Sequence, residues 1–145
     1  MDLDEARRTF EKAVGEYFAF LAAEYGFVRE PMVTVGNACG ITFNARGGSV
    51  LVQFEPPSGI YVTLEAATAP EGIRPDYDLG ALVQESVRRG LWTRQPSHAK
   101  TFEDYVRNAA GLLRAIGHDV LTGDFRILFE RQQRLVDAVR RNRPK

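Results

Sequence analysis

The chain has 145 residues, 44% of them hydrophobic and 26% charged, a composition typical of one globular domain over residues 1–145. Nineteen basic residues balance nineteen acidic residues, so the net charge gives no argument for nucleic acid or an acidic membrane as the main partner. The single cysteine, Cys39, excludes an internal disulfide and suits a reducing compartment. No hydrophobic run is long enough to cross a bilayer, and the N-terminus lacks the apolar segment of a signal peptide. We therefore expect a cytoplasmic domain without a membrane anchor.

The first predicted element is a long amphipathic helix from Leu3 to Tyr25, where hydrophobic residues recur at spacings of three and four. Gly26 follows it at the position where a left-handed residue closes many helices. Phe27, just beyond, is expected to fold back on the last turn. This helix should therefore end at Tyr25 or Gly26.

Residues 32–66 alternate apolar and polar side chains in four short runs, separated by turn-forming residues at 36–38, 46–48 and 56–59. This pattern predicts a four-stranded antiparallel meander with one buried face and one polar face. On the polar face we expect Leu51 and Tyr61 among Thr, Asn, Gln and Glu. The side chains predicted to be buried are Val33, Val35, Ile41, Phe43, Val50, Val52, Phe54, Ile60, Val62 and Leu64.

Three further helices are predicted after an irregular crossing over residues 67–77. Asp78 is a suitable N-cap for a short helix that ends at Gly90, and Thr101 is a suitable N-cap for a strong helix that breaks at Gly117.

The last predicted helix opens at Gly123-Asp124 and carries an apolar stripe that should face inward. That stripe consists of Phe125, Leu128, Phe129, Leu135, Val136 and Val139. The predicted fold is therefore α+β, a four-stranded antiparallel meander with one N-terminal helix and three C-terminal helices packed on one face.

The sequence contains no recognisable catalytic constellation. One cysteine and two histidines cannot supply a structural zinc site, and no nucleophile elbow, phosphate-binding loop or dinucleotide fingerprint is present. His98 is better explained as a polar loop residue, His118 as a residue beside a helix end, and Cys39 as a small turn residue. We therefore assign no catalytic, cofactor-binding or metal-binding residue and expect no cofactor.

Partner binding is the better-supported expectation for the surface. Trp92 lies in a loop with Arg94 and follows Arg88 and Arg89, and Trp and Arg are the residue types most enriched at binding hot spots. The alternative explanation is that Trp92 seals the edge of the core. Tyr61 is a fifth candidate, because an uncovered sheet face can also accept a partner.

Two functions from different classes fit these observations. The first is a non-enzymatic protein-binding module, immunity-like or adaptor-like. The second is a small-ligand binder or enzyme with a pocket between sheet and helices, in which Tyr17, Tyr105 or His98 would supply polar groups. Nucleic-acid binding by the arginine-rich last helix is disfavoured, because no aromatic residues interleave with its exposed bases. The sequence leaves open whether the chain forms a homo-oligomer.

Two short strings carry a family resemblance. A long helix ending in EYGF (Glu24 to Phe27), a strand meander, and later helices with LTGDF (Leu121 to Phe125) together resemble small uncharacterised bacterial α+β proteins, some of which look like immunity proteins of polymorphic toxin systems. The resemblance implies a non-enzymatic cytoplasmic protein that neutralises a toxin by binding it. Both strings also suit plain structural roles, a helix C-cap and a helix N-cap, and no residue role is carried over from the family.

Overall fold

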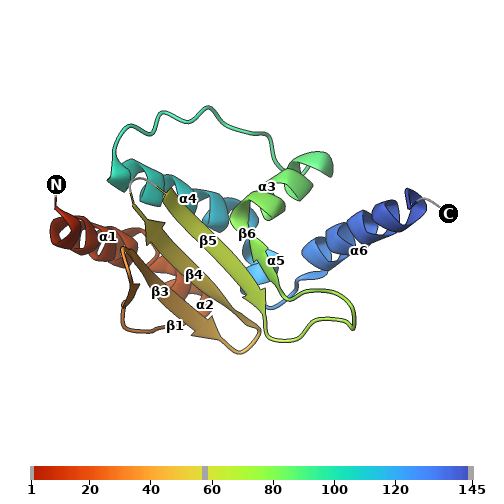
Figure 1. The fold of residues 1–145 in the computed structure, drawn as a ribbon, viewed down its shortest axis with the longest axis horizontal. Helices are drawn as coiled ribbons and strands as arrows, with labels where there is room; N and C mark the ends of the chain where they lie inside the picture. The colour runs from red at the N-terminus through yellow and green to blue at the C-terminus, as the bar shows by residue number, and fades with distance from the viewer. Residues whose placement is uncertain (1, 57–58, 144–145) are drawn as a thin grey trace.

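The computed structural model describes residues 2–56 and 59–143, which form an α+β fold around one antiparallel sheet (Figure 1). The strands are β1 (Val28–Arg29), β2 (Val33–Val35), β3 (Ala38–Ala45), β4 (Gly48–Glu55), β5 (Gly59–Ala66) and β6 (Asp76–Asp78). The helices are α1 (Leu3–Tyr17), α2 (Phe20–Tyr25), α3 (Leu79–Arg88), α4 (Phe102–Ile116), α5 (His118–Leu121) and α6 (Arg126–Arg141).

The predicted antiparallel meander is present as β3, β4 and β5, but the four-stranded prediction is wrong because the sheet has six strands. Its order is β1-β3-β4-β5-β6, and β2 pairs with the same edge of β3 as β1. Strands β1 and β6 have two and three residues, too few for a recognisable alternation. Two residues of the predicted turn at 56–59, Pro57 and Ser58, lie outside the described residues.

The core lies between the inner face of the sheet and the helices. Figure 1 shows α1, α2 and α4 behind β3, β4 and β5, and alternate residues of these strands are buried. Phe10 of α1 stacks on Phe54 of β4 with ring centroids 6.0 Å apart, and Phe102 of α4 meets Phe54 edge-on at 4.6 Å. Leu113 of α4 is fully buried in the same cluster. One aromatic cluster thus joins the first helix, the central strand and the fourth helix.

Strand β2 corrects the predicted buried face. Val33 and Val35 are 62% and 74% exposed, although their alternation with Thr34 placed them with the core residues. Directly paired residues share a face of an antiparallel sheet. Val33 pairs with Gly40 and Val35 with Ala38, whereas the core residues of β3 have odd numbers. All three residues of β2 are exposed, so the predicted burial of one face of this strand is wrong, and the register set by the turn into β3 places both valines on the outer face.

The predicted first helix is broken into α1 and α2 near Phe18. Its predicted end is confirmed, because Gly26 has φ +71° and the N–H of Phe27 donates to the carbonyl of Leu21 at 3.0 Å. The inward packing predicted for the last helix is wrong at its C-terminal half, where Leu135 and Val139 are 42% and 63% exposed. Figure 1 shows the reason, since α6 projects beyond the sheet.

We expect Phe54→Ala and Leu113→Ala each to lower the free energy of unfolding by about 2 to 5 kcal/mol, because each leaves a cavity in the core. Leu135→Ala is the control, since this exposed side chain should cost less than about 1 kcal/mol. Urea denaturation at neutral pH measures all three. A loss below about 1 kcal/mol at Phe54 would contradict the assigned inner face.

Candidate interaction surface on the sheet

The five predicted partner-binding residues occupy three different environments. Arg88 and Arg89, at the end of α3, take part in an ion cluster. Trp92 packs partly buried against the core. Arg94 and Tyr61 are exposed and line the same groove. The structure therefore brings only two of the five together at one accessible site.

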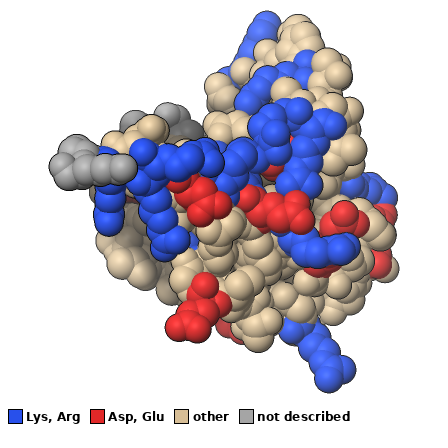
Figure 2. Space-filling model, turned by 90° about the vertical axis from the view of Figure 1, so that its right-hand side faces the viewer, with Lys and Arg blue, Asp and Glu red and all other residues tan. Residues whose placement is uncertain are grey.

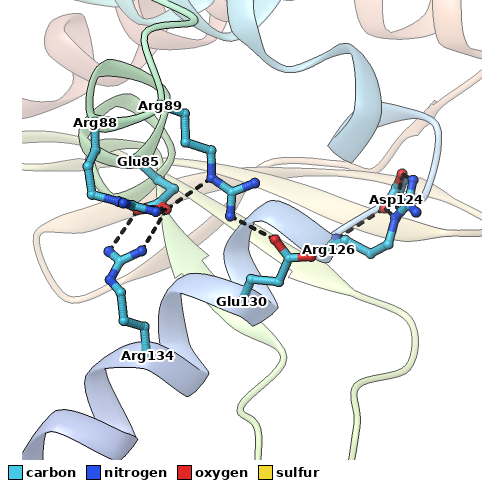
Figure 3. Close-up of polar contacts among 7 residues, drawn as sticks. All are labelled: Glu85, Arg88, Arg89, Asp124, Arg126, Glu130 and Arg134. Carbon is cyan, nitrogen blue, oxygen red and sulfur yellow. Dashed lines mark hydrogen bonds and ion pairs between the residues drawn. The ribbon is translucent and has the colours of Figure 1, made fainter.

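The ion cluster is centred on Glu85 of α3, which is 1% exposed (Figure 3). Arg134 of α6 donates two hydrogen bonds to its carboxylate, at 2.8 and 2.9 Å, and Arg88 donates through Nε and Nη2, both at 2.9 Å. Arg89 donates through Nε at 3.1 Å and reaches Glu130 at 2.8 Å. Hydrogen bonds from these guanidinium groups, those of Arg134 first, hold the pKa of Glu85 well below its usual range.

This cluster joins α3 to α6. Arg131 of α6 adds a hydrogen bond to Gln84 at 2.9 Å, so adjacent positions within about one turn of α6 make polar contacts with α3 and its C-cap residue. Figure 2, which shows the side from which α6 projects, has basic side chains gathered beside acidic ones. Arg88 and Arg89 thus take part in the contact between α3 and α6, and their predicted role in partner binding stays a prediction. Sequence reasoning missed Glu85, although its spacing of three and four residues from Arg88 and Arg89 was a usable signal.

The position of Trp92 favours the alternative explanation, in which it seals the core. Its side chain is partly buried and packs against the buried cluster. Its indole nitrogen is buried and has no hydrogen-bond partner among the described residues. An indole in this position contributes packing and offers little surface to a partner.

Arg94 and Tyr61 line an open groove of about 370 Å³, which we call the β5 groove. It lies between β5, the start of α3 and part of α4. Arg94, in the loop that follows α3, lies at its rim. Asp78 also lines it, but its carboxylate caps α3 by accepting the N–H of Ala81 at 2.7 Å. The complete lining is Ile60, Tyr61, Val62, Asp78, Leu79, Gly80, Val83, Arg94, Ala109 and Leu112.

A second surface covers the outer face of the sheet, and we call Val33, Val35, Leu51 and Tyr61 the outer patch. Tyr61 is 53% exposed and lies in one cross-strand row with Val33, through Gly40 and Gln53. A hollow of about 290 Å³ lies beside Gly40, lined by Val33, Val35 and Leu51 among others. A Cβ at position 40 would lie 3.2 Å from a methyl group of Leu51. Because glycine has no side chain, the hollow beside it stays open. Tyr61 connects the outer patch to the β5 groove.

The polar groups suggested for a small-ligand site are dispersed. Tyr17 donates to Glu103 at 3.1 Å, and Tyr105 is largely exposed. His98 lines a separate groove of about 500 Å³ between its loop and α4, with Arg107 and Asn108. Neither tyrosine lines that groove.

Metal-ligating and nucleophilic groups are likewise scattered. Among the described residues, no group of three or more His, Cys, Asp or Glu could hold a metal ion. Burial raises the pKa of the Cys39 thiol, which disfavours the nucleophilic thiolate.

Comparisons with protein-family models, with curated proteins and with solved structures give no match to this chain. The resemblance to immunity proteins therefore stays a prediction. No helix in the described parts of the chain is both long and apolar enough to cross a membrane.

We expect Glu85→Gln to lower the free energy of unfolding by about 1 to 3 kcal/mol, because it removes charge-assisted hydrogen bonds from three arginines. The arginines are partly solvated, which limits the cost. Gln84→Ala, which removes a neighbouring exposed contact, is the control and should cost less. Equal effects of the two variants in urea denaturation would contradict the structural role of the cluster.

The stabilisation from Glu85 should depend on pH. Because its pKa is lowered in the folded state, its contribution is complete above the unfolded value of about 4.3 and is lost as the pH falls toward the folded value. The difference in unfolding free energy between wild type and Glu85→Gln should be constant between about pH 5 and about pH 8 and shrink below about pH 4. A difference that grows on acidification would contradict this sign.

Proposed function

We propose that the protein is a non-enzymatic protein-binding module and that its partner docks on the outer patch. The observation that carries this proposal is the exposure of Val33, Val35 and Tyr61 on one face of one sheet, each more than half exposed. Exposed apolar patches of this kind mark interaction sites, and Tyr is among the residues most enriched at hot spots.

The surroundings of the outer patch suit an interface. Thr42, Gln53 and Thr63 lie between its apolar members and are partly exposed, so the surface combines apolar and polar groups, as protein interfaces do. The hollow beside Gly40 would receive a side chain of the partner. The patch also lies on the sheet face that points away from the core, so docking there requires no rearrangement of the fold.

An immunity-like role is one form of this proposal, and an adaptor-like role is the other. The resemblance of the EYGF and LTGDF strings supports the first, in a bacterial cytoplasm with a toxin as partner. In the fold these strings have structural roles: Gly26 closes α2, and Gly123 packs against the turn at Gly47, where a Cβ would lie 2.6 Å from the Cα of Gly123. Rescue of cells from a toxin encoded beside this gene would separate the two forms.

A second candidate function, small-ligand binding or catalysis, is favoured by the groove of about 500 Å³ that brings His98, Arg107 and Asn108 together. An imidazole, a guanidinium and an amide could bind an anionic small molecule. A measurable turnover or small-molecule affinity that His98→Ala abolishes would support this candidate over the first.

The experiment for the main proposal begins with a partner captured from the native host by cross-linking, identified and purified. We expect Val33→Glu to weaken its binding at least tenfold, or about 1.4 kcal/mol, since it places an unpaired charge on the outer patch. Titration calorimetry measures the dissociation constant, and the melting temperature should be unchanged because Val33 is exposed.

Val139→Glu is the matched control, since Val139 is an equally exposed valine on α6, outside the outer patch. It should bind like wild type. If Val33→Glu and Val139→Glu bind equally well, the partner does not use the outer patch and the proposal is wrong.

A further inference from the structure

Strand β6 covers only part of the edge of β5. It pairs with Thr63, Leu64 and Glu65, and the chain then leaves the sheet because Leu79 begins α3. In the described part of the chain, no strand pairs with Gly59–Val62 on that side. An unpaired stretch of strand presents backbone donors and acceptors to any extended segment that approaches.

The orientation of these backbone groups follows from two hydrogen bonds. The N–H of Ala66 donates to Pro75, on the β6 side, at 2.9 Å, and the N–H of Ala67 donates to Gly47, on the β4 side, at 3.1 Å. Because successive residues of a strand direct their N–H and C=O groups to opposite sides, Ile60 and Val62 direct theirs away from β4, toward the β5 groove. Continuing the β5–β6 register would pair Val62 with Leu79, but Leu79 is already helical.

The β5 groove next to this edge suits alternate side chains of an added strand. Leu79, Val83 and Leu112 give it an apolar lining on the core side, and Tyr61 stands on the outer face. Since the side chains of a strand alternate between faces, one set would enter the groove while the other packs beside Tyr61.

Arg94 adds charge selectivity. It is exposed at the rim of the groove, and no ion pair joins it to another of the described residues. The one acid that lines the groove, Asp78, is occupied as the cap of α3. The spare charge at the rim is therefore positive, which favours a partner that carries a carboxylate.

We propose that the β5 groove accepts an extended peptide segment, which adds to the edge of β5 beside Ile60 and Val62 and places a carboxylate against Arg94. This proposal rests on the function proposed above, protein binding, and names the kind of partner. The carboxylate belongs either to an acidic side chain or to the C-terminus of the segment.

The test uses a phage-displayed library of random peptides, selected on the wild-type protein alone. We expect a selected peptide, once synthesised, to bind wild type and to lose at least tenfold in affinity to Arg94→Glu by fluorescence anisotropy. Arg46→Glu, an exposed arginine in the turn at the opposite end of β5, is the control and should bind like wild type. Amidation of the peptide C-terminus and Asp→Asn or Glu→Gln replacement within it distinguish the two sources of the carboxylate.

Backbone pairing is tested on the same peptide by methylating one amide nitrogen at a time. Methylation at alternate residues should weaken binding at least tenfold, and methylation at the residues between them should have little effect. In hydrogen exchange, the amides of Ile60 and Val62 should slow at least tenfold on binding, whereas the amide of Tyr61, which faces β4, should not change.

Equal sensitivity at every methylated position, exchange protection confined to Val33–Val35, or selection of only peptides that Arg94→Glu binds equally well would overturn the proposed mode. These failures leave the function standing if the natural partner still depends on Val33. Conversely, the peptide could bind β5 as described while Val33→Glu leaves the affinity of the natural partner unchanged. That result would support strand addition at the edge of β5 and would contradict docking on the outer patch.

Discussion

Burial of the inner face of β3, β4 and β5 under α1 and α4 is the interaction on which the rest of the structure depends. Phe54 is central to it, because the rings of Phe10 and Phe102 contact it from two helices that are far apart in the sequence. Each of these aromatic side chains removes a large apolar area from water, and the contact among the three rings fixes how the sheet lies on both helices. Elements outside this cluster are held by smaller contacts. One example is α6, which packs on the core through Leu128 and Phe129 and is also joined to α3 by the charges around Glu85.

One-sided burial determines which surfaces remain for a partner. The inner face is filled by side chains, so what a partner can reach is the outer face, where Val33, Val35 and Tyr61 are exposed, and the stretch of β5 that β6 leaves unpaired. Tyr61 belongs to both surfaces. A partner that docks on the outer face could therefore also supply a strand to the edge, and the two proposals would then describe one interface.

Local signals in the sequence predicted much of this fold. The alternation in β3–β5 predicted the meander, and the capping residues Asp78 and Thr101 begin α3 and α4 as expected, Thr101 with a complete capping box. These features depend on residues close together in the chain. Features that depend on distant segments were missed: Glu85 meets Arg134 across 49 positions, and the exposure of Val139 follows from where α6 lies relative to the sheet.

The candidate site was predictable only in part, for the same reason. Tyr61 and Arg94 could be selected by residue type, but their meeting in one groove depends on how the loop after α3 crosses the end of β5. Val33 and Val35 were placed on the wrong face because alternation fixes the period of a strand and the turn fixes its register. Arg88 and Arg89 were selected by type as well, and the sequence reasoning did not include their buried ion-pair partner, Glu85.

The central claim is that the outer patch and the edge of β5 form the surface that binds a protein partner. Residue-resolved hydrogen exchange, with and without the captured partner, tests it most directly, because every amide outside the core serves as an internal control. We expect added protection in β2 and at Ile60 and Val62, and none in α1, α4 or the loop that carries His98. Protection confined to α6 or to that loop would contradict the claim.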